Sequence, residues 1–195
     1  MDALSLTEAL PVVALAVALA ACAGLRAWLP LLLAGALSRL GWLELGESFR
    51  FLGSTKALVI FGIATVLELV GDKVPTLDHA LDVLGTPLRP AAGALLASSV
   101  LGQISDPLAA VVLGTAVGAP AAMVPHAAKS TLRAASTTLT AGLANPVLSL
   151  LEDVATVVLF VLAVVLPLVV ILMLGIVTYL VARRLTRSRA TVKTA

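Results

Sequence analysis

Ala57-Leu-Val-Ile-Phe-Gly-Ile-Ala-Thr-Val-Leu67 is an uninterrupted apolar stretch, and Glu68-Leu-Val-Gly-Asp72-Lys73-Val-Pro75 follows it directly. The apolar part suits a helix in lipid, because a helix satisfies its own backbone hydrogen bonds where no water is present. Three ionisable side chains then lie at its end. Ionisable groups at membrane depth are costly and usually face a bundle interior or a water-filled cavity. The stretch therefore predicts a membrane helix and points to a functional site.

The composition of the whole chain predicts an integral membrane protein. Of the 195 residues, 60% are hydrophobic and 12% are charged, and the mean hydropathy is +1.10. A soluble domain carries roughly twice this charged fraction. Continuous apolar runs favour helices over the alternating strands of a barrel. We therefore expect an all-α, polytopic helical membrane protein with short, Pro/Gly-broken or re-entrant helices, formed by a single domain over residues 1–182.

Basic residues crowd the C-terminus, where residues 183–195 form an expected basic tail with Arg183, Arg184, Arg187, Arg189 and Lys193. The positive-inside rule places this tail in the cytoplasm. We interpret it as a topology anchor, so no nucleic-acid partner is expected. Cys22 is the only cysteine, which excludes a disulfide within the chain.

The first apolar segment is too long for one simple span, and two pieces are predicted. Ser5-Leu-Thr-Glu8 has the pattern of a capping box, and the chain is apolar from Ala9 to Gly24. Pro30 removes a backbone amide and kinks or breaks a helix. The break is therefore placed near Arg26, which either enters the bundle or marks a membrane surface.

Capping residues and prolines predict the later helix starts. Ser54 and Thr55 are expected to cap the helix that ends near Val74. Ser105-Asp106-Pro107 and Asn145-Pro146 each combine a cap with a proline in the first turn.

Other breaks follow from amphipathicity and proline. Residues 76–84 are predicted to form a short interfacial helix, and residues 85–90 a turn. The helix starting at Pro107 is expected to end near Val117. The charge-free stretch Val154–Ala182 exceeds one span, and Pro167 leaves two possibilities, a kinked helix or a tight hairpin.

Glu68 and Asp72 are four residues apart, so they share one helix face. Two such carboxylates can bind a hard cation through oxygen or share a proton, because each negative charge raises the pKa of the other. Lys73 can neutralise one of them. The alternative is an ion-pair lock with Arg26 or Arg133.

Further acidic residues extend the predicted ion-binding site or charge network. Asp78 and Asp82 lie around His79, and Glu152 and Asp153 lie in the first turns of the helix that begins at Pro146. Their alternatives are a solvated helix face and compensation of a helix dipole. The complete predicted set is Glu68, Asp72, Lys73, Asp78, Asp82, Arg26, Glu152 and Asp153.

His126, Lys129 and Arg133 follow one another at helical spacing and form a basic stripe. Such a stripe binds anions, either the carboxylates above or a lipid phosphate group. The alternative is a helix lying at the cytoplasmic interface.

No enzyme is expected, because the sequence has no H-E-x-x-H, G-x-S-x-G or phosphate-binding loop motif. Two histidines and one cysteine argue against a transition-metal site, and no cofactor is expected. The identity of any bound metal ion stays open.

Several motifs together resemble the bacterial membrane family catalogued as domain of unknown function 4126. They are Gly24-Leu-Arg26-Ala-Trp-Leu-Pro30, Glu68-x-x-x-Asp72-Lys73-Val-Pro75 with Asp78, Arg89-Pro90-x-x-Gly93, His126-Ala-Ala-Lys129 with Arg133, and Asn145-Pro146-x-x-Ser149-x-x-Glu152-Asp153. The resemblance covers nearly the whole chain and implies a multi-pass protein of the bacterial inner membrane. It implies no activity.

The motif at Glu68 is also similar to the Glu-x-Gly-Asp-Lys signature of cation/proton exchangers that handle calcium and manganese. Here three residues, rather than two, separate Glu68 from Asp72, and a second copy is missing.

The sequence therefore leaves three alternative functions. The first is a small ion transporter or channel, cation- or proton-coupled, that uses the Glu68/Asp72 pair. The second is a membrane scaffold whose charges only hold short helices together, and the third is a protein that binds anionic lipid through the basic stripe. The expected partners are the lipid bilayer, a small ion and further copies of the chain.

Overall fold

The computed structural model describes the backbone of residues 6–73 and 75–193, and the side chains of residues 7–73, 83–180 and 183. Within this part the chain is helical and has no strand, which confirms the all-α prediction. The elements are α1 (Leu6–Leu25), α2 (Trp28–Arg39), η1 (Glu47–Gly53), α3 (Thr55–Gly71), α4 (Pro75–Leu101), α5 (Pro107–Thr140), α6 (Asn145–Val165) and α7 (Pro167–Lys193).

Among the described residues, three helices are long and apolar enough to cross a membrane, namely α1 from Thr7, α5 and α6. A fourth span results if η1 and α3, which meet at a bend of 57°, are counted as one. The helices α2 and α7, up to Leu180, are apolar but shorter. The chain is therefore a polytopic helical membrane protein.

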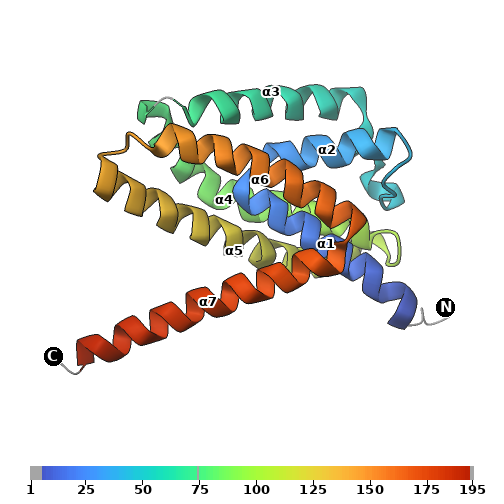
Figure 1. The fold of residues 1–195 in the computed structure, drawn as a ribbon. Coiled ribbons are helices and arrows are strands. Elements are labelled where there is room, and N and C mark those ends of the chain that lie inside the picture. Colours follow the sequence, from blue (N-terminus) through green and yellow to red (C-terminus); the bar gives the residue numbers. More distant parts are fainter. Residues whose placement is uncertain (1–5, 74, 194–195) are drawn as a thin grey trace.

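The helices α1 and α2 form a hairpin whose tip lies inside the bundle. The chain leaves α1 at Leu25 and enters α2 at Trp28, so Arg26 and Ala27 make the turn, as predicted. In Figure 1, α1 begins and α2 ends at the same end of the molecule. A helix of 20 residues is about 30 Å long, so α1 reaches deep into the bundle before the chain returns.

The helix α3 starts where the sequence predicts. The side-chain oxygen of Ser54 accepts a hydrogen bond from the amide of Ala57, at 3.2 Å. The helix then packs mainly against α2, where Trp28 stacks on Phe61 with ring centroids 6.2 Å apart. Its other face exposes a row of apolar side chains suited to lipid, among them Val59, Ile63, Val66 and Val70.

The predicted turn at residues 85–90 is wrong, because α4 runs through Pro87 and Pro90 without a break. The predicted end of the next helix near Val117 is also wrong, since α5 passes Pro120 and Pro125 and ends at Thr140. A proline removes one backbone hydrogen bond, and a helix packed against neighbours tolerates that loss. The start of α5 is confirmed, because Asp106 accepts hydrogen bonds from the amides of Leu108 and Ala109.

The stretch Val154–Ala182 is a hairpin of two helices rather than one kinked helix. The helix α6 ends at Val165 and α7 starts at Pro167. Figure 1 shows the chain reversing there, after which α6 and α7 diverge toward the end of the molecule that carries the C-terminus. The predicted cap at Asn145 is wrong, since Ala144 precedes α6 without a capping side chain. The side-chain Nδ2 of Asn145 instead donates to the hydroxyl of Thr137.

The centre of the bundle is formed by α1, α4 and α5, which pack most closely. Small residues make this possible. A Cβ added to Gly24 would overlap the carbonyl oxygen of Ala122, and one added to Gly114 would overlap the backbone of Ser98. Close backbone approach through small residues is typical of helix packing in lipid.

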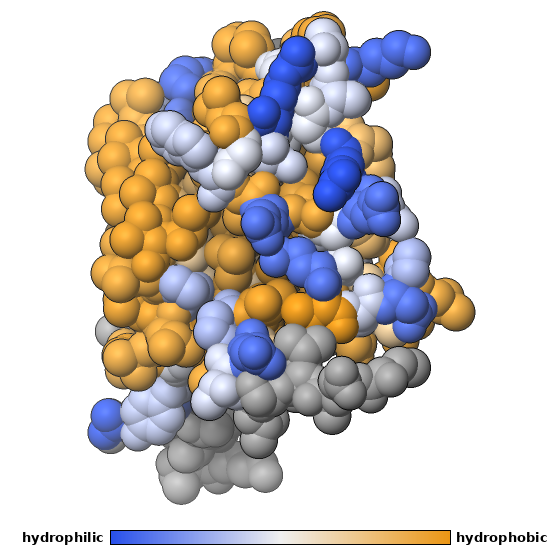
Figure 2. Space-filling model, turned by 90° about the vertical axis from the view of Figure 1, so that its right-hand side faces the viewer, coloured by the Kyte–Doolittle hydropathy of each residue, from blue (hydrophilic) through white to orange (hydrophobic). Residues whose placement is uncertain are grey.

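Polar side chains gather at the end of the molecule where α1 begins and α2 ends. Figure 2 looks at this end and shows hydrophilic residues over its centre, flanked by an apolar side. The segment between α2 and α3 lies here. It is tied to α4 because the amide of Gly46 donates to the carbonyl of Ser99, at 2.7 Å.

Candidate functional site: a buried charge network

Arg26 occupies the tip of the α1–α2 hairpin, and its side chain is fully buried. Its Nη1 donates to the Asp72 carboxylate at the end of α3. Its Nη2 donates to the hydroxyl and the carbonyl of Ser149 in α6, at 2.9 and 3.2 Å. The same nitrogen lies 2.5 Å from Oδ1 of Asp153, which is a charge contact rather than an aligned hydrogen bond. The hairpin tip is thus joined to α3 and α6.

Asp72 lies among three cations. Besides Arg26, Nη2 of Arg133 donates to its Oδ2 at 3.1 Å, and Nζ of Lys129 lies 3.6 Å from the same oxygen. Both basic residues belong to α5 and are buried. The other oxygen, Oδ1, is buried and has no hydrogen-bond partner among the described residues. One side of this carboxylate is therefore fully engaged and the other is not.

Glu152 links α5 to α6. Nε and Nη2 of Arg133 donate to its two carboxylate oxygens at 3.1 and 3.0 Å, which is the bidentate geometry that planar guanidinium favours. Nζ of Lys129 lies 2.9 Å from its Oε2. Because a buried ion is stable only when it is paired, these contacts hold α5 and α6 in register.

Two charged side chains stabilise the backbone ends at the hairpin tip. Glu68 accepts hydrogen bonds from the amides of Ala27 and Trp28, at 3.0 and 3.3 Å, where α2 begins. Lys129 donates to the carbonyl of Leu25, at 3.3 Å, where α1 ends. Helix starts have unpaired amides and a partial positive charge, whereas helix ends have unpaired carbonyls and a partial negative charge. Glu68 and Lys129 match these partial charges from two other helices.

Lys73 and His126 lie at the edge of the network. Nζ of Lys73 lies 3.3 Å from Oδ2 of Asp153, and the Lys73 side chain is 38% exposed, so the network reaches solvent here. Nδ1 of His126 lies 3.0 Å from Nη1 of Arg89. Arginine has no acceptor, so Nδ1 accepts this hydrogen bond and carries no proton.

Two pockets meet at Asp72. A pocket of about 650 Å³ lies between α3, α4, α5 and the start of α6. Most of its surface is apolar, but we name it the polar pocket because Lys73, His126, Ser130 and Arg133 line it. A smaller pocket of about 250 Å³ lies between α3 and α4 and is lined by Glu68 and Arg89 among others. Asp72 lines both pockets.

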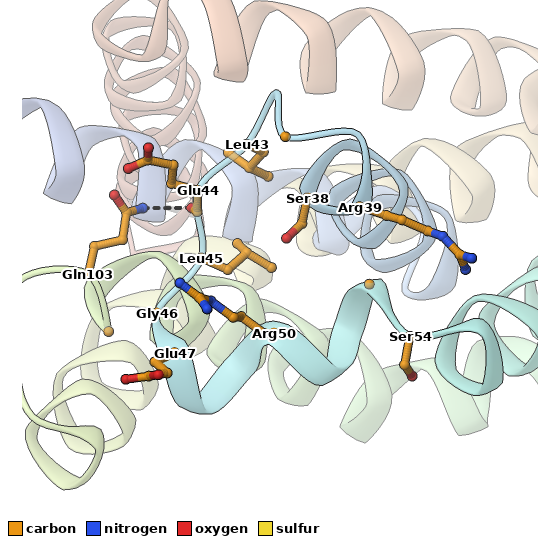
Figure 3. A pocket seen from close by; sticks show the side chains of 13 residues that line it. Ser38, Arg39, Leu43, Glu44, Leu45, Gly46, Glu47, Arg50, Ser54 and Gln103 are labelled. Atoms are coloured by element: carbon orange, nitrogen blue, oxygen red, sulfur yellow. Dashed lines mark hydrogen bonds between the residues drawn. The ribbon is translucent and has the colours of Figure 1, made fainter.

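A separate pocket of about 830 Å³ lies at the opposite end of the bundle, between the segment after α2 and the turn after α4. Figure 3 shows that Gln103 closes one side of it, by donating from its amide to the carbonyl of Glu44 at 2.8 Å. Exposed charges of both signs line it, with Glu44, Glu47 and Arg50 among them. No residue of the charge network lines this pocket.

Most of the predicted site residues come together. Arg26, Asp72, Lys73, Glu152 and Asp153 form one network with two members of the basic stripe, Lys129 and Arg133. Glu68 is adjacent but contacts backbone amides. His126 is paired with Arg89. Asp78 and Asp82 lie in the first turns of α4, and the side chains of these two residues are outside the described part of the structure.

Sequence reasoning missed two contributors to the site. Ser149 stands only in the family motif and not in the predicted set, although it accepts hydrogen bonds from Arg26 one turn before Asp153. Arg89 likewise stands only in a family motif, although it is almost fully buried, which marks it as a member of a polar cluster.

The described side chains contain no group of three or more His, Cys, Asp or Glu that could hold a metal ion. The arrangement instead supports exchange of charge partners. Asp72 offers one oxygen to three cations, and its other oxygen has no hydrogen-bond partner among the described residues.

A family model described as domain of unknown function (DUF4126) matches residues 13–187. It covers every residue of the charge network. No curated protein and no solved structure matches the chain.

Proposed function

For this chain, which belongs to the family described as domain of unknown function (DUF4126), we propose that it is a small membrane transporter or channel for protons or a small cation. The charge network at the tip of the α1–α2 hairpin is its ion site, and Asp72 is the group that binds the ion. The protein carries out no covalent chemistry in this proposal.

The observation that carries the proposal is the position of Asp72. This carboxylate lines two pockets, and its buried Oδ1 has no hydrogen-bond partner among the described residues. Buried polar atoms are normally paired, and an orphan requires an explanation. An ion or proton that enters either pocket reaches the residue that carries this oxygen.

The mechanism follows from the competition for Asp72. When a proton or cation neutralises Asp72, the attraction between Asp72 and Arg26 weakens. Arg26 keeps its contacts with Ser149 and Asp153 on α6. The end of α3 then loses its ion pair with the hairpin tip, which stays with α6, while Glu68 keeps its contacts with the amides of Ala27 and Trp28. Movement of one group of helices against another around a fixed site is the usual form of alternating access.

We propose that the network end faces the cytoplasm of a bacterial inner membrane. The C-terminal end of α7, with its basic residues, lies at the same end of the molecule as this site (Figure 1), and basic residues favour the cytoplasmic side. Lipid covers the exposed apolar side chains of α3 and α7. Toward the opposite end, α1, α4 and α5 pack too closely to leave an ion pathway within one copy of the chain. Further copies of the chain therefore complete the pathway there.

Ion flux into liposomes tests this proposal. We expect the purified protein to carry protons or K⁺ faster than empty liposomes do, as measured with an enclosed pH-sensitive dye and imposed K⁺ gradients. Asp72→Asn should reduce the rate to that of empty liposomes, because the amide cannot take up a proton or balance a cation. Glu47→Gln, at an exposed carboxylate far from the network, is the matched control and should retain the rate.

Thermal unfolding and size-exclusion profiles of the same samples establish that each variant is folded. Wild-type protein that carries neither ion faster than empty liposomes would contradict the proposal, as would a folded Asp72→Asn variant with unchanged flux.

The scaffold function is the second candidate, and the contacts of Glu68 favour it. This carboxylate binds the amides of Ala27 and Trp28, which stabilises a helix start rather than a mobile ion. The network also joins α1, α3, α5 and α6. If Asp72→Asn fails to fold and wild-type flux equals that of empty liposomes, the scaffold function is favoured.

A further inference from the structure

The helices α5 and α6 touch each other at few points, and ion pairs bridge the space between them. Arg133 on α5 binds Glu152 on α6, and Lys129 binds the same carboxylate. The polar pocket of about 650 Å³ described above lies on one side of these pairs. On the other side lies an apolar pocket of about 330 Å³, enclosed by α1, α5, α6 and α7.

The apolar pocket is lined by aliphatic side chains, including Leu132, Leu151 and Met173. Its only charged lining residues among those described are Lys129 and Glu152. Residues of α7 between 170 and 177 form part of its lining, and Figure 1 shows α7 diverging from the rest of the bundle toward its C-terminal end. Leu132 and Leu151 are exposed, so the pocket borders the lipid-facing surface.

The polar pocket has the groups that bind a phosphate. Lys73 and Arg133 provide positive charge, and Ser130 and Thr137 provide hydroxyl donors. The carboxylate of Asp72 lines the same pocket and pairs with Arg26, Lys129 and Arg133. A guanidinium binds a phosphate in the same bidentate way as a carboxylate. A phosphate in this pocket would therefore compete directly with Glu152 for Arg133.

We propose that one anionic phospholipid binds between α5 and α6, with its phosphate beside Lys73 and Arg133 and an acyl chain in the apolar pocket. The occupant is a membrane lipid because a phosphate site and an acyl-chain site lie back to back across one ion pair. A free anion would use the first pocket and leave the second unexplained. This lipid site shares Arg133 and one pocket with the proposed ion site at Asp72, and the test below separates the two because it measures lipid binding rather than ion flux.

The test measures lipid binding by native mass spectrometry of the full-length protein in detergent. The probes are phosphatidylglycerol and phosphatidylcholine with identical acyl chains. Wild-type protein should bind one phosphatidylglycerol with about tenfold preference over phosphatidylcholine, the effect of about one additional charged contact. Ala128→Trp fills the apolar pocket and should remove this binding, whereas Ala127→Trp, on the neighbouring exposed face of α5, should retain it.

A second pair of variants tests the phosphate site. Lys73→Ala should reduce the preference for phosphatidylglycerol, whereas Lys56→Ala, an exposed lysine near the start of α3, should not. Equal binding of the two lipids to wild type would overturn the proposal. Full binding of phosphatidylglycerol to a folded Ala128→Trp variant would also overturn it. A third contradicting result would be that inorganic phosphate displaces all of the lipid from wild type and binds equally well to wild type and Ala128→Trp.

Discussion

Arg26→Met is expected to lower the free energy of unfolding by about 3–5 kcal/mol, the usual effect of removing one partner from a buried ion pair. The methionine matches much of the arginine volume but leaves Asp72 and Asp153 facing each other without the cation between them. It also leaves the carbonyl and hydroxyl of Ser149 without their donor. The loss should appear as a large decrease in the thermal unfolding midpoint and in the yield of monodisperse protein.

Two further variants make this result specific. Arg39→Met removes an exposed arginine at the end of α2 whose side chain donates to the hydroxyl of Thr55, so it should change the midpoint little. The double variant Arg26→Met/Asp72→Leu removes the uncompensated carboxylate as well and should recover part of the loss. A midpoint for Arg26→Met equal to that of Arg39→Met would show that the network does not hold the hairpin tip.

Gly24→Val is expected to prevent folding, because no side chain fits between α1 and α5 at this position. A Cβ there would overlap the carbonyl oxygen of Ala122, and backbone atoms cannot move aside as a flexible side chain can. Overpacking in a core typically costs about 1–3 kcal/mol, and separating two central helices costs more. Size-exclusion chromatography of detergent extracts should show aggregated protein only.

Gly62→Ala is the matched control for this substitution. No atom lies within 4 Å of a Cβ added at Gly62 in α3. Alanine in a helix is favoured over glycine by about 0.5–1 kcal/mol, so this variant should be at least as stable as wild type. Monodisperse, stable Gly24→Val protein would contradict the close packing of α1 against α5.

The local features of the fold could be predicted from the sequence. Ser54 and Asp106 cap helices as expected, and the break near Arg26 lies where Pro30 and the length of the apolar segment place it. These features depend on a few neighbouring residues. The membership of the charge network was predictable for a similar reason, since a buried charge in lipid requires a partner.

The hydrogen-bond partners of the charged side chains, and the continuation of helices through proline, could not be predicted in the same way. Glu68 binds the amides of Ala27 and Trp28, about forty residues away along the chain, and nothing near Glu68 specifies this. Pro87 and Pro90 do not end α4, because the effect of a proline depends on the neighbouring helices. Both outcomes are properties of the packed bundle rather than of a local motif.

The contacts also change the interpretation of the acidic pair at the end of α3. Glu68 and Asp72 share a helix face but have different roles, because Glu68 stabilises the start of α2 whereas Asp72 pairs with three cations. We therefore centre the proposed cation site on Asp72 instead of sharing it equally between the two carboxylates. The free Oδ1 of Asp72 is the feature that an ion or proton would use.

The α1–α2 hairpin carries Arg26 into the charge network from the far end of the bundle. Cysteine labelling in sealed, oriented vesicles tests it most directly, in a Cys22→Ala background, with single cysteines at the exposed positions Thr7, Trp42 and Leu143. Thr7→Cys and Trp42→Cys should react with an impermeant maleimide added on one side of the membrane, and Leu143→Cys only when it is added on the other. Labelling of Thr7→Cys and Trp42→Cys from opposite sides would contradict the hairpin and, with it, this account of the site.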